Sequence, residues 1–107
     1  MSALPVLISA DAAADLEQIQ EYGIANGFGD PVAFTRELQA RLLHLSDHPR
    51  AGRVGRIEGT REWVLTGTPF ISVYELIGEP TEAIGILNIL HGALQWPPAE
   101  LPQKRGQ

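Results

Sequence analysis

The hydrophobic pattern of the chain changes its period once, and this change limits the folds that the chain can adopt. Apolar residues recur every three to four positions as far as Leu45, and side chains alternate between two faces from Phe70 to Ile77. The first period is typical of amphipathic helices and the second of strands. Residues 46–52 (SDHPRAG) lie between the two regions and have the composition of a turn. The sequence therefore predicts an α+β fold.

Two helices are predicted in the first half of the chain. The first covers residues 10–26 with Ser9 as its N-cap, and the second covers residues 31–46 with Asp30 as its N-cap. Their apolar stripes consist of Ala12, Leu16, Ile19 and Gly23 in the first helix and of Phe34, Leu38, Leu42 and Leu45 in the second. Because the link between them is short, we expect an antiparallel helix hairpin that packs on a sheet.

The second half of the chain supplies a small antiparallel sheet. We expect strands at residues 54–58, 62–66, 70–77 and 83–90, separated by short turns that contain Gly, Pro and Thr. Consecutive strands joined by short turns pair as an antiparallel meander. A further strand at residues 5–8 precedes the first helix and can join an edge of this sheet.

The length of the chain, 107 residues, suits one domain with a single two-layer core. We assign residues 1–96 to this domain and residues 97–107, which are rich in Pro and polar residues, to a flexible tail. The chain has no Cys, which excludes disulfides and thiolate metal sites and fits a reducing compartment. No segment has the pattern of an export signal or a membrane span, so we expect a cytoplasmic protein.

The charge of the chain is unevenly distributed. The formal net charge is −5, which argues against general nucleic-acid binding because phosphates are gripped by clustered Lys and Arg. Residues 1–48 contain seven acidic residues and two Arg, whereas residues 49–76 contain four Arg and three Glu. The basic character is concentrated at Arg50, Arg53, Arg56 and Arg61. Arginine suits bidentate recognition of carboxylate or phosphate, although such residues also decorate solvated strands and turns.

Histidines provide two further candidate sites. His44, Asp47 and His48 have metal-ligand spacing, but imidazoles at a helix end are common without a metal, so we predict no metal site and no cofactor. His91 directly follows an apolar strand, and we expect its ring to emerge at an edge of the sheet. An imidazole there can act as an acid or a base near neutral pH, or it can simply bond to a neighbouring strand.

Four short motifs in order resemble a known family. They are HPRAGR at residues 48–53, GTRE at 59–62, PFISVY at 69–74 and ILHGALQWP at 89–97. Together with a strand, a helix hairpin and a meander, this set closely resembles the RelE/ParE superfamily of toxins from bacterial type II toxin–antitoxin systems. The resemblance covers about residues 4–97, and it implies a small toxin that a cognate antitoxin wraps and neutralises. Its target would be ribosome-bound mRNA in RelE-like members or DNA gyrase in ParE-like members.

The chain departs from the RelE-like pattern at two positions. RelE-like ribonucleases resemble one another in having one arginine within the strand that corresponds to residues 70–77 and a second arginine after the last strand. This chain has Ile71 and Leu94 at these two positions. An apolar side chain cannot stabilise the charge that develops on a phosphate, and losing one such contact costs about 2.7–4 kcal/mol of transition-state stabilisation. We therefore expect a ParE-like toxin that binds DNA gyrase and is not an enzyme.

The resemblance and the pattern of charges lead to three groups of site residues. We expect the target to be bound by Arg61, His91 and Trp96. We expect the antitoxin to lie in an apolar groove between the helix hairpin and the sheet, with its acidic side chains paired to some of Arg50, Arg53, Arg56 and Arg61. The alternative is a metal-independent mRNA endoribonuclease in which Arg53, Arg61 and His91 take the catalytic roles. A third possibility is a degenerate member that retains antitoxin binding without toxicity.

Overall fold

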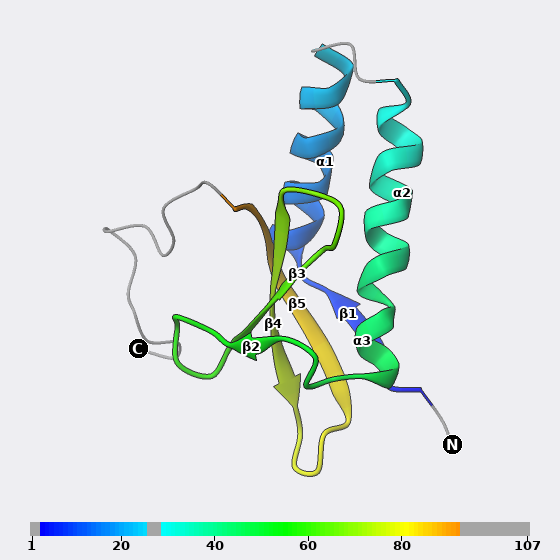
Figure 1. Cartoon of the computed structure of the whole chain (residues 1–107). Coiled ribbons are helices and arrows are strands. Elements are labelled where there is room, and N and C mark those ends of the chain that lie inside the picture. Colours follow the sequence, from blue (N-terminus) through cyan, green and yellow to red (C-terminus); the bar gives the residue numbers. More distant parts are fainter. Residues whose placement is uncertain (1–2, 26–28, 93–107) are drawn as a thin grey trace.

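The fold consists of a helix hairpin and a five-stranded sheet (Figure 1). The computed structural model describes residues 3–25 and 29–92. The helices are α1 (Ala10–Ala25), α2 (Pro31–Leu42) and the short α3 (His44–Asp47). The strands are β1 (Val6–Ile8), β2 (Arg53–Val54), β3 (Arg61–Val64), β4 (Phe70–Ile77) and β5 (Ala83–His91). The tail predicted at residues 97–107, and Trp96, lie outside the described residues.

The starts of both long helices confirm the predicted caps. The Ser9 hydroxyl accepts a hydrogen bond from the Ala12 backbone N–H at 3.0 Å, in the first turn of α1. The Asp30 carboxylate does the same for the Ala33 N–H at 3.1 Å, and Pro31 occupies the first turn of α2. Each cap satisfies a backbone donor that has no partner within the helix.

The second helix is shorter than predicted. It ends at Leu42, and residues 44–47 form the separate helix α3. The Leu43 N–H bonds to the Ala40 carbonyl, three residues back, which tightens the last turn of α2. Ser46 is bound to the N-terminal segment, because its hydroxyl donates to the Leu4 carbonyl at 2.6 Å and its own carbonyl accepts the Leu4 N–H. This tie turns the chain while Leu45 stays fully buried.

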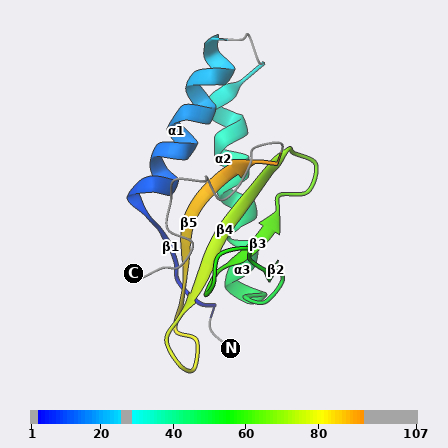
Figure 2. The ribbon, with the colours of Figure 1, turned by 90° about the vertical axis from the view of Figure 1, so that its left-hand side faces the viewer.

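The sheet has the strand order β1-β5-β4-β3-β2 (Figure 2). Strands β2 to β5 form the predicted antiparallel meander, and β1 joins its edge parallel to β5, so that the sheet is mixed. The strand predicted at residues 54–58 is only the pair Arg53–Val54, and the strand predicted at 62–66 is Arg61–Val64. The first of these ends early because the Gly55 N–H bonds to the Thr60 carbonyl and closes a loop.

The helices pack on one face of the sheet, where the hydrophobic core lies. Leu38 is fully buried, as its place in the predicted stripe requires. The buried core residues are Ala12, Leu16, Leu38, Leu42, Leu45, Leu65, Tyr74, Ile84, Ile86 and Ile89. Across residues 3–25 and 29–92, no helix is long and apolar enough to cross a lipid bilayer.

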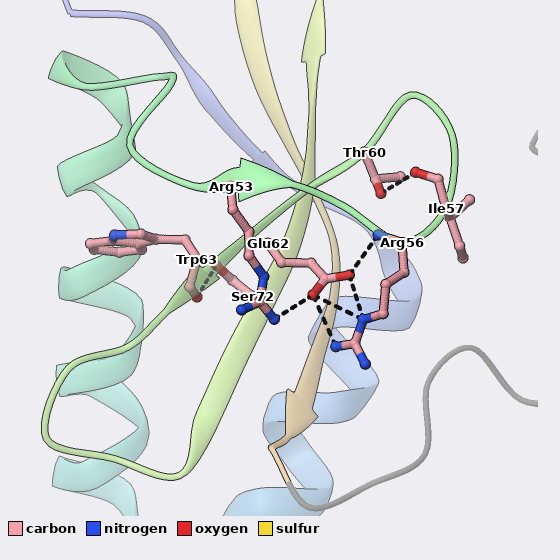
Figure 3. Close-up of polar contacts among 7 residues, drawn as sticks. All are labelled: Arg53, Arg56, Ile57, Thr60, Glu62, Trp63 and Ser72. Carbon is pink, nitrogen blue, oxygen red and sulfur yellow. Dashed lines mark hydrogen bonds and ion pairs between the residues drawn. The ribbon is translucent and has the colours of Figure 1, made fainter.

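The alternation of side chains along the strands defines two faces. Trp63 and Phe70 pack against the core, and Tyr74 is part of it, so we call their side the helix-facing side of the sheet. The neighbours of these residues in β3 and β4 point the other way and form the outer face, which includes Glu62, Val64, Ile71 and Val73. Figure 3 shows Trp63 and Glu62 pointing to opposite sides of β3.

Candidate functional site

A buried carboxylate on the outer face joins two of the predicted arginines (Figure 3). The Glu62 side chain is fully buried, and its Oε1 lies 3.0 Å from Arg53 Nη2 and 2.9 Å from Arg56 Nη2. Arg56 also donates its backbone N–H to Oε2 at 3.0 Å. The side chains of Arg53 and Arg56 remain 62% and 47% exposed. Solvent or a partner can therefore reach both guanidinium groups, although one carboxylate already holds them.

The electrostatics of this cluster favour the ionised carboxylate. Burial acts to raise the pKa of Glu62, but the hydrogen bonds and charge of Arg56 and the hydrogen bond of Arg53 outweigh burial and lower the pKa to about 2. The hydrogen bond to Glu62 in turn raises the pKa of Arg56. Glu62 thus stays charged at neutral pH, and the cluster of three side chains has a net charge near +1.

The loop between β2 and β3 explains how Arg56 reaches Glu62. Thr60 donates its hydroxyl to the Ile57 carbonyl at 2.6 Å, and Gly59 has a φ of +85°, which favours glycine. A Cβ at Gly55 would lie 2.2 Å from the Thr60 hydroxyl, so the close approach of the two chain segments requires glycine there. Glu62 was not among the residues singled out from the sequence. The sequence contained one signal that could have identified Glu62. If the chain turns at Gly59–Thr60, this acidic residue lies opposite Arg53 on the neighbouring strand.

Arg61 lies on the helix-facing side and is bound to the loop that precedes β2. Its Nη1 donates to the Gly52 carbonyl at 2.6 Å. The buried Tyr74 hydroxyl accepts the Gly52 N–H at 2.9 Å and donates to the Pro49 carbonyl at 2.8 Å. A Cβ at Gly52 would lie 2.8 Å from the Tyr74 ring. Burial raises the pKa of Tyr74, so this hydroxyl stays protonated as a donor.

His91 is the last residue of β5 and pairs with Phe70, the first residue of β4. It lies in an apolar groove between the helix hairpin and the sheet. Its ring meets the Phe70 ring edge-on, with 5.7 Å between centroids. The groove has a volume of about 720 Å³. The groove is lined by Asp15, Gln18, Ile19, Tyr22, Phe34, Pro69, Phe70, Ile89, Leu90 and His91. The Asp15 carboxylate closes one wall by accepting the Ile89 backbone N–H at 2.8 Å.

The structure separates several residues that the sequence grouped together. Arg61 pairs with Tyr74 of β4, and His91 pairs with Phe70 of the same strand. Phe70 and Tyr74 are four residues apart, so Arg61 and His91 are separated by about 13 Å along the strand direction. Arg53 lies on the outer face, opposite to both. The trio named for a ribonuclease, Arg53, Arg61 and His91, is therefore not brought to one point in the structure.

His44 is the first residue of α3, and His48 and Arg50 lie in the loop that follows this helix. All three are exposed, and the two imidazole rings stack with 4.4 Å between their centroids. Among residues 3–25 and 29–92, no group of three or more His, Cys, Asp or Glu side chains has a metal-binding arrangement.

Comparison with known proteins agrees with this architecture. The fold is similar to that of a chain from the chromosomal ParDE toxin–antitoxin system of P. aeruginosa, with a TM-score of 0.71, 22% identity, and coverage of 83% of this chain and 96% of the other. It is also similar to a chain of the RelBE2 toxin–antitoxin complex of Mycobacterium tuberculosis, with a TM-score of 0.63, 22% identity, and coverage of 84% and 99%.

Sequence comparison goes further than the fold. Y4kP, a protein of Sinorhizobium fredii (strain NBRC 101917 / NGR234) that is named as a toxin, is 33% identical over 85 residues, which cover 77% of this chain and 84% of Y4kP. The family model described as the ParE toxin of the type II toxin–antitoxin system parDE matches residues 6–96. The chain therefore belongs to the ParE toxin family, within the RelE/ParE superfamily of type II toxin–antitoxin systems.

Proposed function

We propose that this toxin inhibits DNA gyrase by binding to it and does not cleave RNA. The observation that carries the proposal is the environment of Ile71, at the position where RelE-like ribonucleases resemble one another in having an arginine. Ile71 lies on the outer face between Val64 of β3 and Leu90 of β5. These three apolar side chains in a row offer no donor for the charge that develops on a phosphate.

The titratable groups nearby also favour binding over catalysis. A general acid or base works best with a pKa near the working pH, whereas the pKa of Glu62 is about 2. His91 belongs to the helix-facing groove, on the opposite side of the sheet from Arg53 and Arg56. The net charge of −5 further disfavours docking on ribosomal RNA. An inhibitor that only binds needs none of these groups for chemistry.

Two assays on one preparation test this proposal. The purified toxin is added to gyrase with plasmid, and separately to ribosomes that translate a reporter mRNA. We expect loss of supercoiling with intact mRNA, and His91→Gln should retain that inhibition. Cleavage of mRNA that His91→Gln lowers by about 10²–10⁴-fold would establish the ribonuclease alternative. An effect in neither assay would indicate a degenerate toxin, and it would contradict the proposal as well.

Arg61, His91 and Trp96 are the residues that we propose to contact the target. Arg and Trp dominate binding hot spots, so Arg61→Ala and Trp96→Ala should abolish toxicity in cells that lack the antitoxin. Arg61 also holds the Gly52 carbonyl, so its loss loosens the loop as well. Tyr74→Phe is the matched control, because it loosens the same loop and keeps the guanidinium. Toxicity that survives Arg61→Ala and Trp96→Ala would show that another surface binds the target.

We further propose that a cognate antitoxin neutralises the toxin and that an apolar antitoxin segment occupies the groove beside His91. Tyr22 lines this groove and is 62% exposed, whereas Ile24, also on α1, is 60% exposed and lies outside it. Tyr22→Ala should weaken antitoxin binding by at least tenfold, and Ile24→Ala should leave it unchanged. Equal affinities for the two variants would place the antitoxin elsewhere. Binding to gyrase and to an antitoxin would both occur in the cytoplasm.

A further inference from the structure

A pocket at the end of α3 brings together three side chains that can carry positive charge. It has a volume of about 420 Å³ and is lined by His44, His48, Pro49, Arg50 and Ala51. The pocket lies near the end of β3 that carries Trp63, away from the groove beside His91. None of the contacts proposed above for gyrase uses these three side chains.

Neighbouring residues fix the positions of the two imidazoles. The His44 ring stacks on the Trp63 ring at 5.2 Å between centroids and 11° between planes. The His48 ring stacks on the His44 ring, with 4.4 Å between the centroids and 27° between the planes. Because Trp63 packs against the hydrophobic core, the stack is anchored to the rigid part of the domain.

The loop that carries Arg50 is held on both sides of that residue. The Tyr74 hydroxyl bonds to the Pro49 carbonyl before it and to the Gly52 N–H after it. Arg61 holds the Gly52 carbonyl from the same side. Arg50 therefore projects from a backbone that is ordered before any ligand arrives, which reduces the entropy that binding costs.

The cluster has no counter-ion within the described part of the chain. No hydrogen bond or ion pair to Arg50 is found there, whereas the guanidinium groups of Arg41, Arg53, Arg56 and Arg61 all have partners. Asp47 lies between the two histidines in sequence, and it forms no ion pair with either imidazole. No acidic side chain of the described residues therefore neutralises the charge of Arg50.

We propose that Arg50, His44 and His48 form a binding site for a carboxylate side chain of a protein partner. The planar guanidinium of Arg50 offers two parallel N–H donors to the carboxylate, and the imidazoles add further donors at its edge. A protein carboxylate fits better than a nucleic acid, because the formal net charge of the chain is −5 and a polyanion is repelled by an acidic protein. The site goes beyond the proposed inhibition of gyrase and does not depend on it.

The test uses the full chain and a hexaglutamate peptide, with hexaglutamine as the uncharged control. Imidazole resonances are followed by NMR during titration. We expect saturable shifts at His44 and His48 and none at His91, which lies in the separate groove. Arg50→Gln should weaken binding by about tenfold, the scale of one charge-assisted hydrogen bond. Arg36→Gln is the matched control, since Arg36 is also exposed and has no hydrogen bond or ion pair within residues 3–25 and 29–92.

Three results would overturn the proposal. They are shifts of equal size at all three histidines, equal weakening by Arg36→Gln and Arg50→Gln, or tighter binding of a single-stranded RNA octamer at the same ionic strength. The last result would reassign the cluster to nucleic acid. Gyrase and antitoxin are absent from this experiment, so its failure leaves their roles open, and its success does not depend on them.

Discussion

On the helix-facing side of the sheet, Tyr74, Ile84 and Ile86 are fully buried in one apolar cluster with residues of α1 and α2. On the outer face, the charged side chain of Glu62 is also fully buried, and Arg53 and Arg56 hold it. Burial of apolar surface does not depend on pH, whereas an ion cluster requires its carboxylate to stay ionised. The two faces of one small sheet therefore respond differently to the same change of conditions.

Three of the four arginines predicted to bind an antitoxin already interact with other groups of the molecule. Arg53 and Arg56 share Glu62, and Arg61 bonds to the Gly52 carbonyl. Arg50 alone of the four predicted antitoxin-binding arginines has no hydrogen bond or ion pair with another residue in the described segments. A count of charges along the sequence thus overstates the positive charge that is ready for a partner.

The largest effect is expected on the helix-facing side. Leu38 is fully buried, and Leu38→Ala should lower the free energy of unfolding by about 2–5 kcal/mol through a cavity that a small core cannot fill. Chemical denaturation measures this change. Leu43→Ala is the control, because Leu43 is 60% exposed at the end of the same helix and should cost far less. Similar costs would mean that the core is not where the fold places it.

The outer face should show the stronger dependence on pH. The pKa of Glu62 is lowered in the folded state from 4.5 to about 2, so its contribution is fully present above pH 4.5 and is lost as the pH falls toward 2. The shift corresponds to about 3 kcal/mol of stability at neutral pH. The measurement is the free energy of unfolding of the wild type between pH 7 and pH 2.

Glu62→Gln isolates this contribution from that of the other carboxylates. The difference in unfolding free energy between wild type and Glu62→Gln should shrink steadily between pH 5 and pH 2. A difference that stays constant over this range would show that the cluster is not held by the ionised form. Leu38→Ala provides the contrast, since its cost should not follow the titration of Glu62.

A smaller effect is expected where Tyr74 links the helix-facing side to the loop before β2. Tyr74→Phe removes an acceptor from the Gly52 N–H and a donor from the Pro49 carbonyl, and should cost about 1–3 kcal/mol. A double-mutant cycle with Arg61→Gln sharpens the result, because both side chains hold Gly52. Additive costs would show that the two bonds do not support the same loop.

The smallest effect is expected for an ion pair with exposed partners. Arg41 and Glu37 are one turn apart on α2, and their side chains are 2.6 Å apart and 32% and 58% exposed. Glu37→Gln should cost about 0.3–0.5 kcal/mol, and salt should reduce even this. A cost comparable to that of Glu62→Gln would mean that burial does not explain the strength of the outer cluster.

Local rules predicted most of the fold. The caps at Ser9 and Asp30, the buried positions of Leu16, Leu38 and Leu42, and the bounds of β4 follow from patterns within a few residues. The second helix was predicted to extend to residue 46, but it ends at Leu42. We attribute the early end to the bond between Ser46 and Leu4, which lies 42 residues earlier in the chain. No local pattern contains that contact.

The candidate sites divide in the same way. The order of the elements, the apolar stripes and the arginine-rich segment could be predicted from the residues alone, because helix and strand periods and side-chain charge are local properties. Three features came from the folded structure and not from the sequence pattern. They are the side of the sheet that each arginine occupies, the binding of two arginines by Glu62, and the stacking of the histidines beside Arg50 on Trp63. These features depend on register and loop closure between distant segments, where a shift of one residue moves a side chain to the opposite face.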